Sequence, residues 1–302
     1  MNILLTGANG FLGRSISSHL SGKNNFIYSL SKSVGDYKIS LSEHIPDFKH
    51  NFELIIHAAG KAHKTPTNKF EVQEIQNVNV NGTANLLIGL EKTVLPKQFV
   101  FISTVSVYGL DFGLNIKEEH KLFAKDPYGL SKIKAEKLVY EWCEKHKIIC
   151  TILRLPLVVG HNPPGNLGSM IKAIKKGYYL NISGGRAKKS MVFIDDIARN
   201  ILKAAQIGGV YNLTDGYHPS FLEISNLISK QLNKNNSLNI PIWIAMIISF
   251  IGDLIGSNAP INTKKLNKIV SSLTFDDKKA RKAFGWMPSP VLKAFEINYT
   301  NS

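Results

Sequence analysis

The sequence has few cysteines, few acidic residues and no apolar run long enough to cross a bilayer. Of its 302 residues only Cys143 and Cys150 are cysteines, and neither belongs to a CxxC pair or a set with metal-ligand spacing. This usage excludes a disulfide scaffold and fits a reducing compartment. Because an apolar strand is expected from Asn2 onward, we expect no signal peptide and predict a cytoplasmic location.

The shortage of acidic residues makes the chain strongly basic. Lys and Arg number 37 against 22 Asp and Glu, which gives a net charge of +15. Nucleic acid, anionic small molecules and an anionic membrane surface would each suit such a charge. The lysines are scattered, without the compact basic run or basic-aromatic pattern of a nucleic-acid module, so we expect no nucleic-acid partner. We favour a generally lysine-rich composition, which bears on solubility, over a specific anionic partner.

The longest apolar run covers residues 240–252. It holds about a dozen residues before Asp253, well short of the ~20 that span a bilayer, so we expect no transmembrane span. The run predicts a helix that is buried or lies in an interface. Weak peripheral contact with a membrane is the less favoured alternative, and the basic surface would assist it.

Short apolar strands alternate with helical patterns through the first half of the chain. This alternation predicts an α/β fold, a doubly wound Rossmann sheet with parallel strands covered on both faces. The pattern loosens after Gly160, returns near residues 191–213 and is mostly helical beyond. We therefore expect a Rossmann domain over 1–165, completed by the unit near 191–213, and a smaller, mostly helical substrate region over 166–302.

Three glycines follow the first strand and open the next helix. Gly7 would permit a tight turn, Gly10 would let the backbone approach a pyrophosphate, and Gly13 would allow close helix–strand packing. The helix N-terminus would offer N–H groups and partial positive charge to phosphates. An ordinary glycine turn is the alternative, but the strand–turn–helix context favours a dinucleotide site.

The end of the second expected strand bears on which dinucleotide binds. A carboxylate there would bind a ribose hydroxyl and select NAD, whereas a basic residue would accommodate a 2′-phosphate. Ser31 and Lys32 stand at this end, no carboxylate follows until Asp36, and Arg14 could add a second cation. We favour NADP(H), with NAD(H) held without the usual aspartate as the alternative.

A tyrosine and a lysine are spaced for proton transfer. Asp126 is a good N-cap and Pro127 a good first helical residue, which puts Tyr128 in the first turn and Lys132 on the same face. We expect the ammonium to lower the tyrosine pKa, so that the phenol exchanges a proton near neutral pH. An exposed helical pair is the alternative, which the neighbouring dinucleotide loop disfavours.

Several motifs resemble those of the extended short-chain dehydrogenase/reductases. They are Thr6-Gly7-x-x-Gly10-x-x-Gly13, Phe101-x-Ser103-Thr104-x-x-Val107-Tyr108-Gly109, Tyr128-x-x-x-Lys132, Asn79-Val80-Asn81-Gly82-Thr83 and Gly285-Trp286-x-Pro288. The chain looks like the nucleotide-sugar 4-epimerases, and still more like bacterial reductases of UDP-linked 4-keto-6-deoxy-HexNAc sugars. A homodimer through helices 68–92 and 127–146 is implied, as is a UDP-sugar substrate.

The resemblance also implies roles for single residues. Thr104 would act with Tyr128 and Lys132 in catalysis, although Ser103 and Ser106 are near enough for a register error. Cofactor contacts would come from Gly7, Asn9, Gly10, Phe11, Leu12, Gly13, Arg14, Ser31, Lys32, Ala58, Ala59, Gly60, Asn79, Ile102, Ser103, Tyr128, Lys132 and Pro156. Substrate contacts would come from Lys61, Thr104, Ser106, Leu157, Arg186 and Lys189.

Two positions depart from the epimerase pattern. Leu157 stands where an asparagine usually contacts the nucleotide sugar, and Lys189 replaces a diphosphate-binding arginine, whose fork lysine lacks. The expected activity is 4-keto reduction in bacterial polysaccharide assembly. A 4-epimerase with retained NAD and a non-catalytic dinucleotide sensor are the alternatives. Asp195 and Asp196 are interpreted as helix caps, and no metal is predicted.

Overall fold

The centre of the fold is a seven-stranded parallel sheet. The structure is a computed structural model that describes residues 1–22, 24–61, 66, 68–255, 259 and 261–297. The strand order β3-β2-β1-β4-β5-β7-β11 reverses direction between β1 and β4, which creates the ligand-binding switch point of doubly wound sheets. The predicted fold class is confirmed. The strands are β1 Asn2–Thr6, β2 Phe26–Ser31, β3 Tyr37–Lys38, β4 Leu54–His57, β5 Gln98–Thr104, β7 Ile149–Leu155 and β11 Gly209–Asn212.

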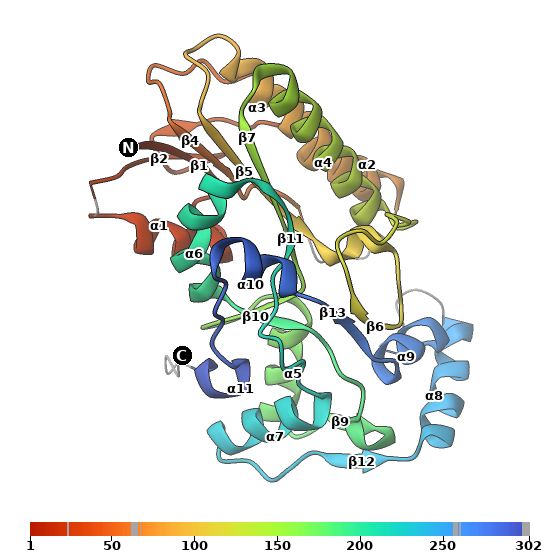
Figure 1. Ribbon diagram of the computed structural model, residues 1–302. Coiled ribbons are helices and arrows are strands. Elements are labelled where there is room, and N and C mark those ends of the chain that lie inside the picture. Colours follow the sequence, from red (N-terminus) through yellow and green to blue (C-terminus); the bar gives the residue numbers. More distant parts are fainter. Residues whose placement is uncertain (23, 62–65, 67, 256–258, 260, 298–302) are drawn as a thin grey trace.

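Helices cover both faces of this sheet (Figure 1). One face packs on α1 (Phe11–Leu20) and α6 (Ile194–Ile207), the other on α3 (Gly82–Leu90) and α4 (Pro127–His146). Successive residues of β1 point to opposite faces. Ile3 and Leu5 pack in the core under α1 and α6, and Leu4 packs in the core under α3 and α4. Both faces are therefore dry, which explains why the strands are apolar runs without alternation.

Helix α4 has the predicted bounds because strong signals mark both of its ends. The Asp126 carboxylate accepts from Gly129 N at 3.0 Å, and Pro127 is the first helical residue. Lys147 closes the helix in the left-handed conformation at φ +56°. These contacts fix Tyr128 in the first turn.

The expected helix over 68–92 is interrupted. It consists of α2 (Lys69–Gln76), a π-helical turn (Asn77–Asn81) and α3, so one residue is inserted into the helical repeat. Asn79, in the middle of the π turn, is buried. Such turns frequently occur at functional sites.

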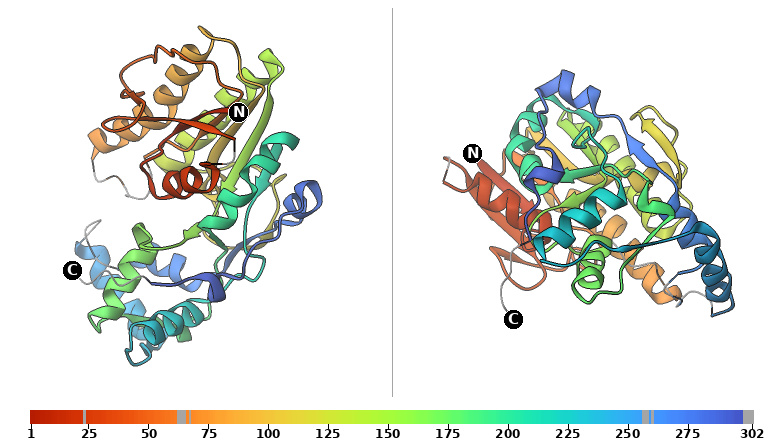
Figure 2. Two further views of the ribbon diagram at one scale, coloured as in Figure 1. Left: turned by 90° about the vertical axis from the view of Figure 1, so that its left-hand side faces the viewer. Right: turned by 90° about the horizontal axis from the view of Figure 1, so that it is seen from below.

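The smaller region lies beside the sheet (Figures 1 and 2). It is mostly helical, as expected, but adds three two-stranded parallel pairs that were not predicted. The expected unit near 191–213 is divided, because β10 pairs with β8 outside the main sheet while β11 joins it. The elements are β8 Leu157–Val159 with β10 Met191–Phe193, β9 Leu180–Ile182 with β12 Leu238–Ile240, β6 Gly113–Ile116 with β13 Leu273–Phe275, and helices α5 Gly165–Lys175, α7 Phe221–Gln231, α8 Ile242–Ile255, α9 Thr263–Val270, α10 Lys278–Phe284 and α11 Val291–Ala294.

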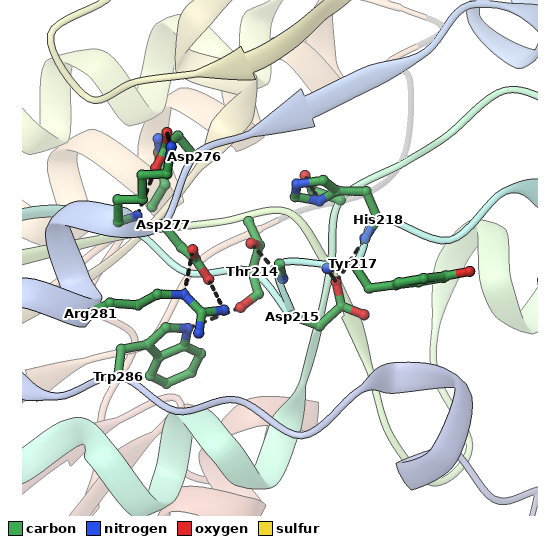
Figure 3. Close-up of polar contacts among 12 residues, drawn as sticks. Thr214, Asp215, Tyr217, His218, Asp276, Asp277, Arg281 and Trp286 are labelled. Atoms are coloured by element: carbon green, nitrogen blue, oxygen red, sulfur yellow. Dashed lines mark hydrogen bonds and ion pairs between the residues drawn. The ribbon is translucent and has the colours of Figure 1, made fainter.

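The C-terminal segment is tied to the loop after β11 (Figure 3). The Trp286 indole donates to Thr214 O at 2.9 Å. Arg281 donates from Nε and Nη2 to the Asp277 carboxylate at 2.8 and 3.0 Å. The Asp215 carboxylate accepts from three backbone N–H groups, those of Tyr217, His218 and Val291. The Gly-Trp-x-Pro motif therefore anchors the smaller region.

Helix α8 is not buried within the chain, and its other expected place, in an interface, stays a prediction. Trp243, Phe250 and Leu254 are 60%, 66% and 78% exposed. Within the part of the chain that the structure describes, no helix has the length and apolarity needed to cross a membrane.

Candidate functional site

The glycine loop has the geometry of a phosphate cradle. Gly7 has φ +70°, and a Cβ atom there would lie 2.7 Å from Ala59 N. A Cβ on Gly13 would lie 2.1 Å from Gly7 O, and Gly10 N donates to the same carbonyl at 2.9 Å. Gly10 is the N-cap of α1 and brings no side-chain cap to its N–H groups. These residues fit the diphosphate of a dinucleotide.

The cradle is braced on its outer side by Asn9. Its side-chain N–H group donates to Ser31 Oγ and to Val34 O, both at 2.9 Å. Arg14 Nη1 donates to Asn9 O at 2.8 Å. The predicted residues Asn9, Arg14 and Ser31 therefore lie together at the ends of β1 and β2, where the adenosine half of a dinucleotide binds in such folds.

The first carboxylate after β2, that of Asp36, is hydrogen-bonded within the strand region. Asp36 accepts from Ser29 N at 2.8 Å and from Ser29 Oγ at 2.7 Å. The Ser29 backbone N–H lowers the pKa of Asp36, as does the Ser29 hydroxyl. Lys32, one residue beyond β2, is exposed. The charged side chain next to Ser31 is thus a cation.

A buried histidine holds the loop opposite the cradle. Thr83 Oγ1 donates to Asn79 O, so it accepts from His57 Nε2, at 2.9 Å. Thr6 Oγ1 accepts from Ala59 N and donates to His57 Nδ1 at 2.6 Å. Burial lowers the pKa of His57 to about 3, so the ring is neutral. A neutral ring has one donor and one acceptor, which matches Nε2 donating to Thr83 and Nδ1 accepting from Thr6. The network fixes Ala58 and Ala59 against Gly7.

Thr104 and Tyr128 share a hydrogen bond at the carboxyl end of β5. Burial raises the pKa of Tyr128 to about 12, although the bond to Thr104 lowers it in part. The tyrosine is therefore protonated across the neutral range. The predicted lowering of this pKa is wrong for the protein alone, because desolvation of the phenolate outweighs the stabilising contacts.

Lys132 lies one helical turn further along α4, in a dry pocket. Its Nζ donates to Ile102 O at 2.9 Å and lies 4.6 Å from the centre of the Phe101 ring. A Cβ on Gly60 would lie 3.3 Å from Nζ, so the loop backbone passes close to the ammonium. Burial lowers the pKa of Lys132 to about 8. The ammonium is directed at a carbonyl, which helps to explain why it leaves the Tyr128 pKa high.

Asn79 connects this pair to the loop after β4. Its Oδ1 accepts from Lys61 N at 2.8 Å, and its Nδ2 donates to Lys61 O at 3.1 Å and Ser131 Oγ at 2.9 Å. Ser131 Oγ in turn donates to Tyr128 O at 2.7 Å. The π turn thus clamps the loop to the first turn of α4. Ser131 was missed in the sequence, where nothing distinguishes it from any helical serine.

Neighbouring contacts bear on which hydroxyl at the end of β5 lies beside Tyr128. Ser103 Oγ donates to the Glu136 carboxylate, two turns further along α4 than Tyr128. Ser106 Oγ accepts from Thr104 Oγ1 at 3.2 Å. The geometry therefore favours Thr104 as the hydroxyl beside Tyr128, and leaves Ser103 only its backbone to offer a cofactor.

A buried ion pair behind the site was also missed. Arg154 Nη2 donates to Glu136 Oε2 at 2.8 Å, with both side chains under 10% exposed. Arg154 Nη1 also donates to Tyr108 OH at 3.2 Å. Because Glu136 lies one turn after Lys132, the pair ties β7 to α4. The sequence offers no signal for it, since the two residues are far apart along the chain.

The predicted substrate residues are less concentrated. The Lys61 ammonium forms an ion pair with Glu74 on α2. Leu157 is half-buried in β8, and Arg186 is exposed after a short 3₁₀ turn. Lys189 is half-buried, and burial lowers its pKa to about 8. Leu157, Arg186 and Lys189 all belong to the smaller region. Of the remaining cofactor candidates, Phe11 and Leu12 begin α1, and Pro156 lies between β7 and β8.

Asp195 and Asp196 do not cap α6 as predicted. The N-cap is Phe193, and both acids occupy the first helical turn. Asp195 accepts from Ser15 Oγ at 2.8 Å and so joins α6 to α1, while Asp196 accepts from Ser289 N at 2.7 Å. Among the described residues, no group of His, Cys, Asp and Glu could hold a metal ion.

The glycine cradle and the buried Thr–Tyr–Lys set occur within one stretch of chain, and a family model matches that stretch. The model of the NAD dependent epimerase/dehydratase family covers residues 3–214. The chain belongs to this family. It is thus an NAD(P)-dependent enzyme, and the predicted family is confirmed.

Two curated relatives match most of the chain. UDP-glucose 4-epimerase of Vibrio cholerae is 27% identical over 316 residues, which cover 97% of this chain and 92% of the relative. N-acetyl-α-D-glucosaminyl-diphospho-ditrans,octacis-undecaprenol 4-epimerase of Escherichia coli O157:H7 is 27% identical over 300 residues, which cover 92% and 88%.

Solved structures show the same fold. UDP-glucose 4-epimerase of Thermotoga maritima with UDP-glucose has a TM-score of 0.76 at 20% identity, over 97% of this chain and 96% of that one. RMD of Pseudomonas aeruginosa complexed with NADPH has a TM-score of 0.73 at 20% identity, over 97% and 95%.

Proposed function

We propose that this family member is a reductase that converts the 4-keto group of a UDP-linked 6-deoxy-HexNAc to an alcohol at the expense of NADPH. The observation that carries the proposal is the buried Tyr128 hydroxyl beside Thr104, with Lys132 one turn further along the same helix. Burial raises the pKa of Tyr128 to about 12, so the phenol keeps its proton in the neutral range. Reduction of a ketone needs a proton donor at the carbonyl oxygen, and this phenol can supply it.

The side chains divide the work of the reaction. The bound cofactor would supply the hydride to the sugar C4. The Tyr128 phenol would donate its proton to the oxygen as the hydride arrives. Thr104 Oγ1 would hydrogen-bond the same oxygen and polarise the carbonyl. Lys132, fixed by Ile102 O, would stabilise the phenolate that remains until a solvent proton replaces the one transferred.

The charges at the end of β2 support NADP(H) as the cofactor. Lys32 is exposed beside Ser31, and the Arg14 side chain is held nearby through Asn9 O. The Asp36 carboxylate, which would repel a 2′-phosphate, is instead bound to Ser29. Two cations near one ribose favour a phosphate over a free diol.

Loss of NADPH absorbance with a UDP-4-keto-6-deoxy-HexNAc substrate tests the proposal. One NADPH should be oxidised for each sugar reduced, and NADH should serve more slowly. The same sugar already reduced at C4 is the control and should leave NADPH untouched. If no NADPH is consumed at any substrate concentration, the protein is not this reductase.

A 4-epimerase with retained NAD is the second candidate, because two relatives are named for that reaction. Such an enzyme would carry bound NAD through purification and would equilibrate UDP-GlcNAc with UDP-GalNAc without consuming cofactor. The Escherichia coli relative is named for a sugar carried on undecaprenyl diphosphate. The epimerase assay therefore also includes polyprenyl-diphosphate-linked GlcNAc.

We also propose that the protein acts in the cytoplasm as a homodimer. Exposed apolar side chains on the two helices that would pair support this: Phe70 on α2 is 77% exposed, and Tyr140 on α4 is 47% exposed. The native mass in solution tests it, and Phe70→Glu should shift the protein to a monomer.

A further inference from the structure

Helix α8 has its large apolar side chains on the outside. Its buried face consists of the small residues Ala245, Ser249 and Gly252. A Cβ on Gly252 would lie 1.9 Å from Ile261 O, so the helix backbone lies directly against the chain before α9. The exposed side chains are nearly all apolar: Ile242, Trp243, Met246, Ile247, Ile248, Phe250, Ile251, Leu254 and Ile255.

The width of this apolar surface distinguishes between its potential occupants. At about 100° per residue, the exposed apolar side chains cover an arc of about 240° around the helix axis. A helix that packs against one partner needs a stripe of about 100°, so a second copy docked along one seam would leave most of the surface in water. A bilayer interface surrounds a protruding helix and would cover the whole arc.

The length of α8 fixes how it would lie in a bilayer. Its 14 residues span about 21 Å, shorter than the ~30 Å hydrocarbon core. The helix protrudes at the edge of the smaller region, at the far end of the molecule from β2 (Figure 1). It could thus reach a surface without a clash with the main sheet, and would lie along it.

The charges around α8 complement anionic lipid. Residues 226–275 contain five lysines, namely Lys230, Lys234, Lys264, Lys265 and Lys268, and one acidic residue, Asp253. Three of the lysines are on α9, which packs against α8; Lys268 forms an ion pair with Asp111, and Lys265 Nζ donates to Ala259 O. The Asp253 carboxylate accepts from Thr263 N and Oγ1 at the start of α9. Its negative charge therefore interacts with the positive N-terminal end of that helix dipole.

We propose that α8 docks the protein on an anionic membrane surface, with the helix at the level of the headgroups and the α9 lysines against anionic lipid. The docking goes beyond the proposed reduction and does not depend on it. If the proposed function also holds, the docking would place the nucleotide-sugar site next to a bilayer.

The full chain, mixed with sedimentable vesicles, tests the docking without any substrate. One vesicle set is phosphatidylcholine alone, and the other also contains about a third phosphatidylglycerol. Binding should be at least tenfold stronger to the anionic set and should weaken as salt is raised. Trp243 is a built-in reporter, because Trp142 and Trp286 are only 7% and 1% exposed. Its emission should shift to the blue on binding. Protein that stays in the supernatant, without a shift, overturns the proposal.

Substitutions on the exposed face assign the binding to α8. Met246→Glu with Phe250→Glu should weaken vesicle binding at least tenfold without a change in melting temperature, since both side chains are exposed. Phe26→Glu on β2, where the side chain is 67% exposed, is the matched control and should bind as the unaltered protein does. Phe250→Leu should also retain binding.

The rival occupant, a second copy of the chain, has its own signature. In that case the unaltered protein would be a dimer, the variant with Met246→Glu and Phe250→Glu would be a monomer, and neither would bind vesicles. That result would overturn the membrane proposal. It would leave the reductase proposal untouched, because the NADPH assay uses soluble sugar and does not involve α8.

Discussion

Replacement of Lys132 by methionine should abolish activity and change how stability depends on pH. Burial holds the pKa of this lysine at about 8 in the folded protein, against a usual value of 10.5. The unfolded chain therefore binds the proton more tightly than the folded chain. Below pH 8 the lysine is charged in both states, and the folded state bears the full cost of desolvation. That cost is relieved as the pH rises from about 8 to 10.5.

The magnitude follows from the shift in the pKa. A difference of 2.5, from 10.5 to about 8, corresponds to about 3 kcal/mol of destabilisation at pH 7, at roughly 1.4 kcal/mol per unit. At pH 9.5 linkage leaves about 1.4 kcal/mol, so the unaltered protein should gain about 2 kcal/mol relative to Lys132→Met between these pH values. This difference does not depend on the hydrogen bond that Ile102 O loses in the variant, because that loss is the same at both pH values.

Denaturant unfolding at pH 7 and pH 9.5 measures the effect. Lys137→Met is the matched control, since Lys137 is on the same helix with its side chain 73% exposed. Its free energy of unfolding should stay within about 0.5 kcal/mol of the unaltered protein at both pH values. If Lys132→Met and the unaltered protein differ in free energy of unfolding by the same amount at pH 7 and pH 9.5, the argument that Lys132 is buried as a desolvated cation is refuted.

Three further predictions concern the site. Tyr128→Phe should lower kcat by about 10²–10⁴-fold with cofactor affinity retained. The control Tyr140→Phe, on the exposed side of the same helix, should leave both quantities unchanged. Steady-state kinetics and cofactor titration measure them, and a fully active Tyr128→Phe would remove the tyrosine from the mechanism. Gly13→Ala forces a Cβ to within 2.1 Å of Gly7 O, so it should cost about 1–3 kcal/mol of stability and weaken cofactor binding at least tenfold. Thermal unfolding measures the stability, and fluorescence titration measures the binding. Normal binding would mean that the cradle is not the cofactor site. Lys32→Ala should weaken NADPH binding about fivefold or more and leave NADH binding nearly unchanged, and equal losses for the two would argue against a 2′-phosphate contact.

The sequence predicted those parts of the fold that local signals determine. Helix α4 has its expected bounds because Asp126 and Pro127 mark its start, and Tyr128 and Lys132 follow from them. The glycine spacing likewise predicted the cradle, since close backbone contacts leave no room for a Cβ at Gly7 or Gly13. The π turn at Asn79 was not predicted, because a single inserted residue barely changes the apolar periodicity of a long helix.

The parts that were not predicted depend on distant contacts. The Glu136–Arg154 pair joins a helix to a strand that no local pattern relates. The pKa of Tyr128 was expected to fall because spacing along a helix shows which charges are near, but not how deeply the phenol is buried. Helix α8 was expected to be buried or to lie in an interface, because apolar composition usually indicates a covered surface. Its buried side is instead the face with small residues, which depends on how α9 packs.

The transfer of deuterium tests the central claim most directly. NADPH that carries deuterium at the transferable position of the nicotinamide would be incubated with the enzyme and a UDP-4-keto-6-deoxy-HexNAc, and the product sugar examined by mass spectrometry and NMR. The account predicts one deuterium at C4 of each product molecule, and almost none of that product with Tyr128→Phe. A 4-epimerised sugar without deuterium, formed while NADPH persists, would contradict it.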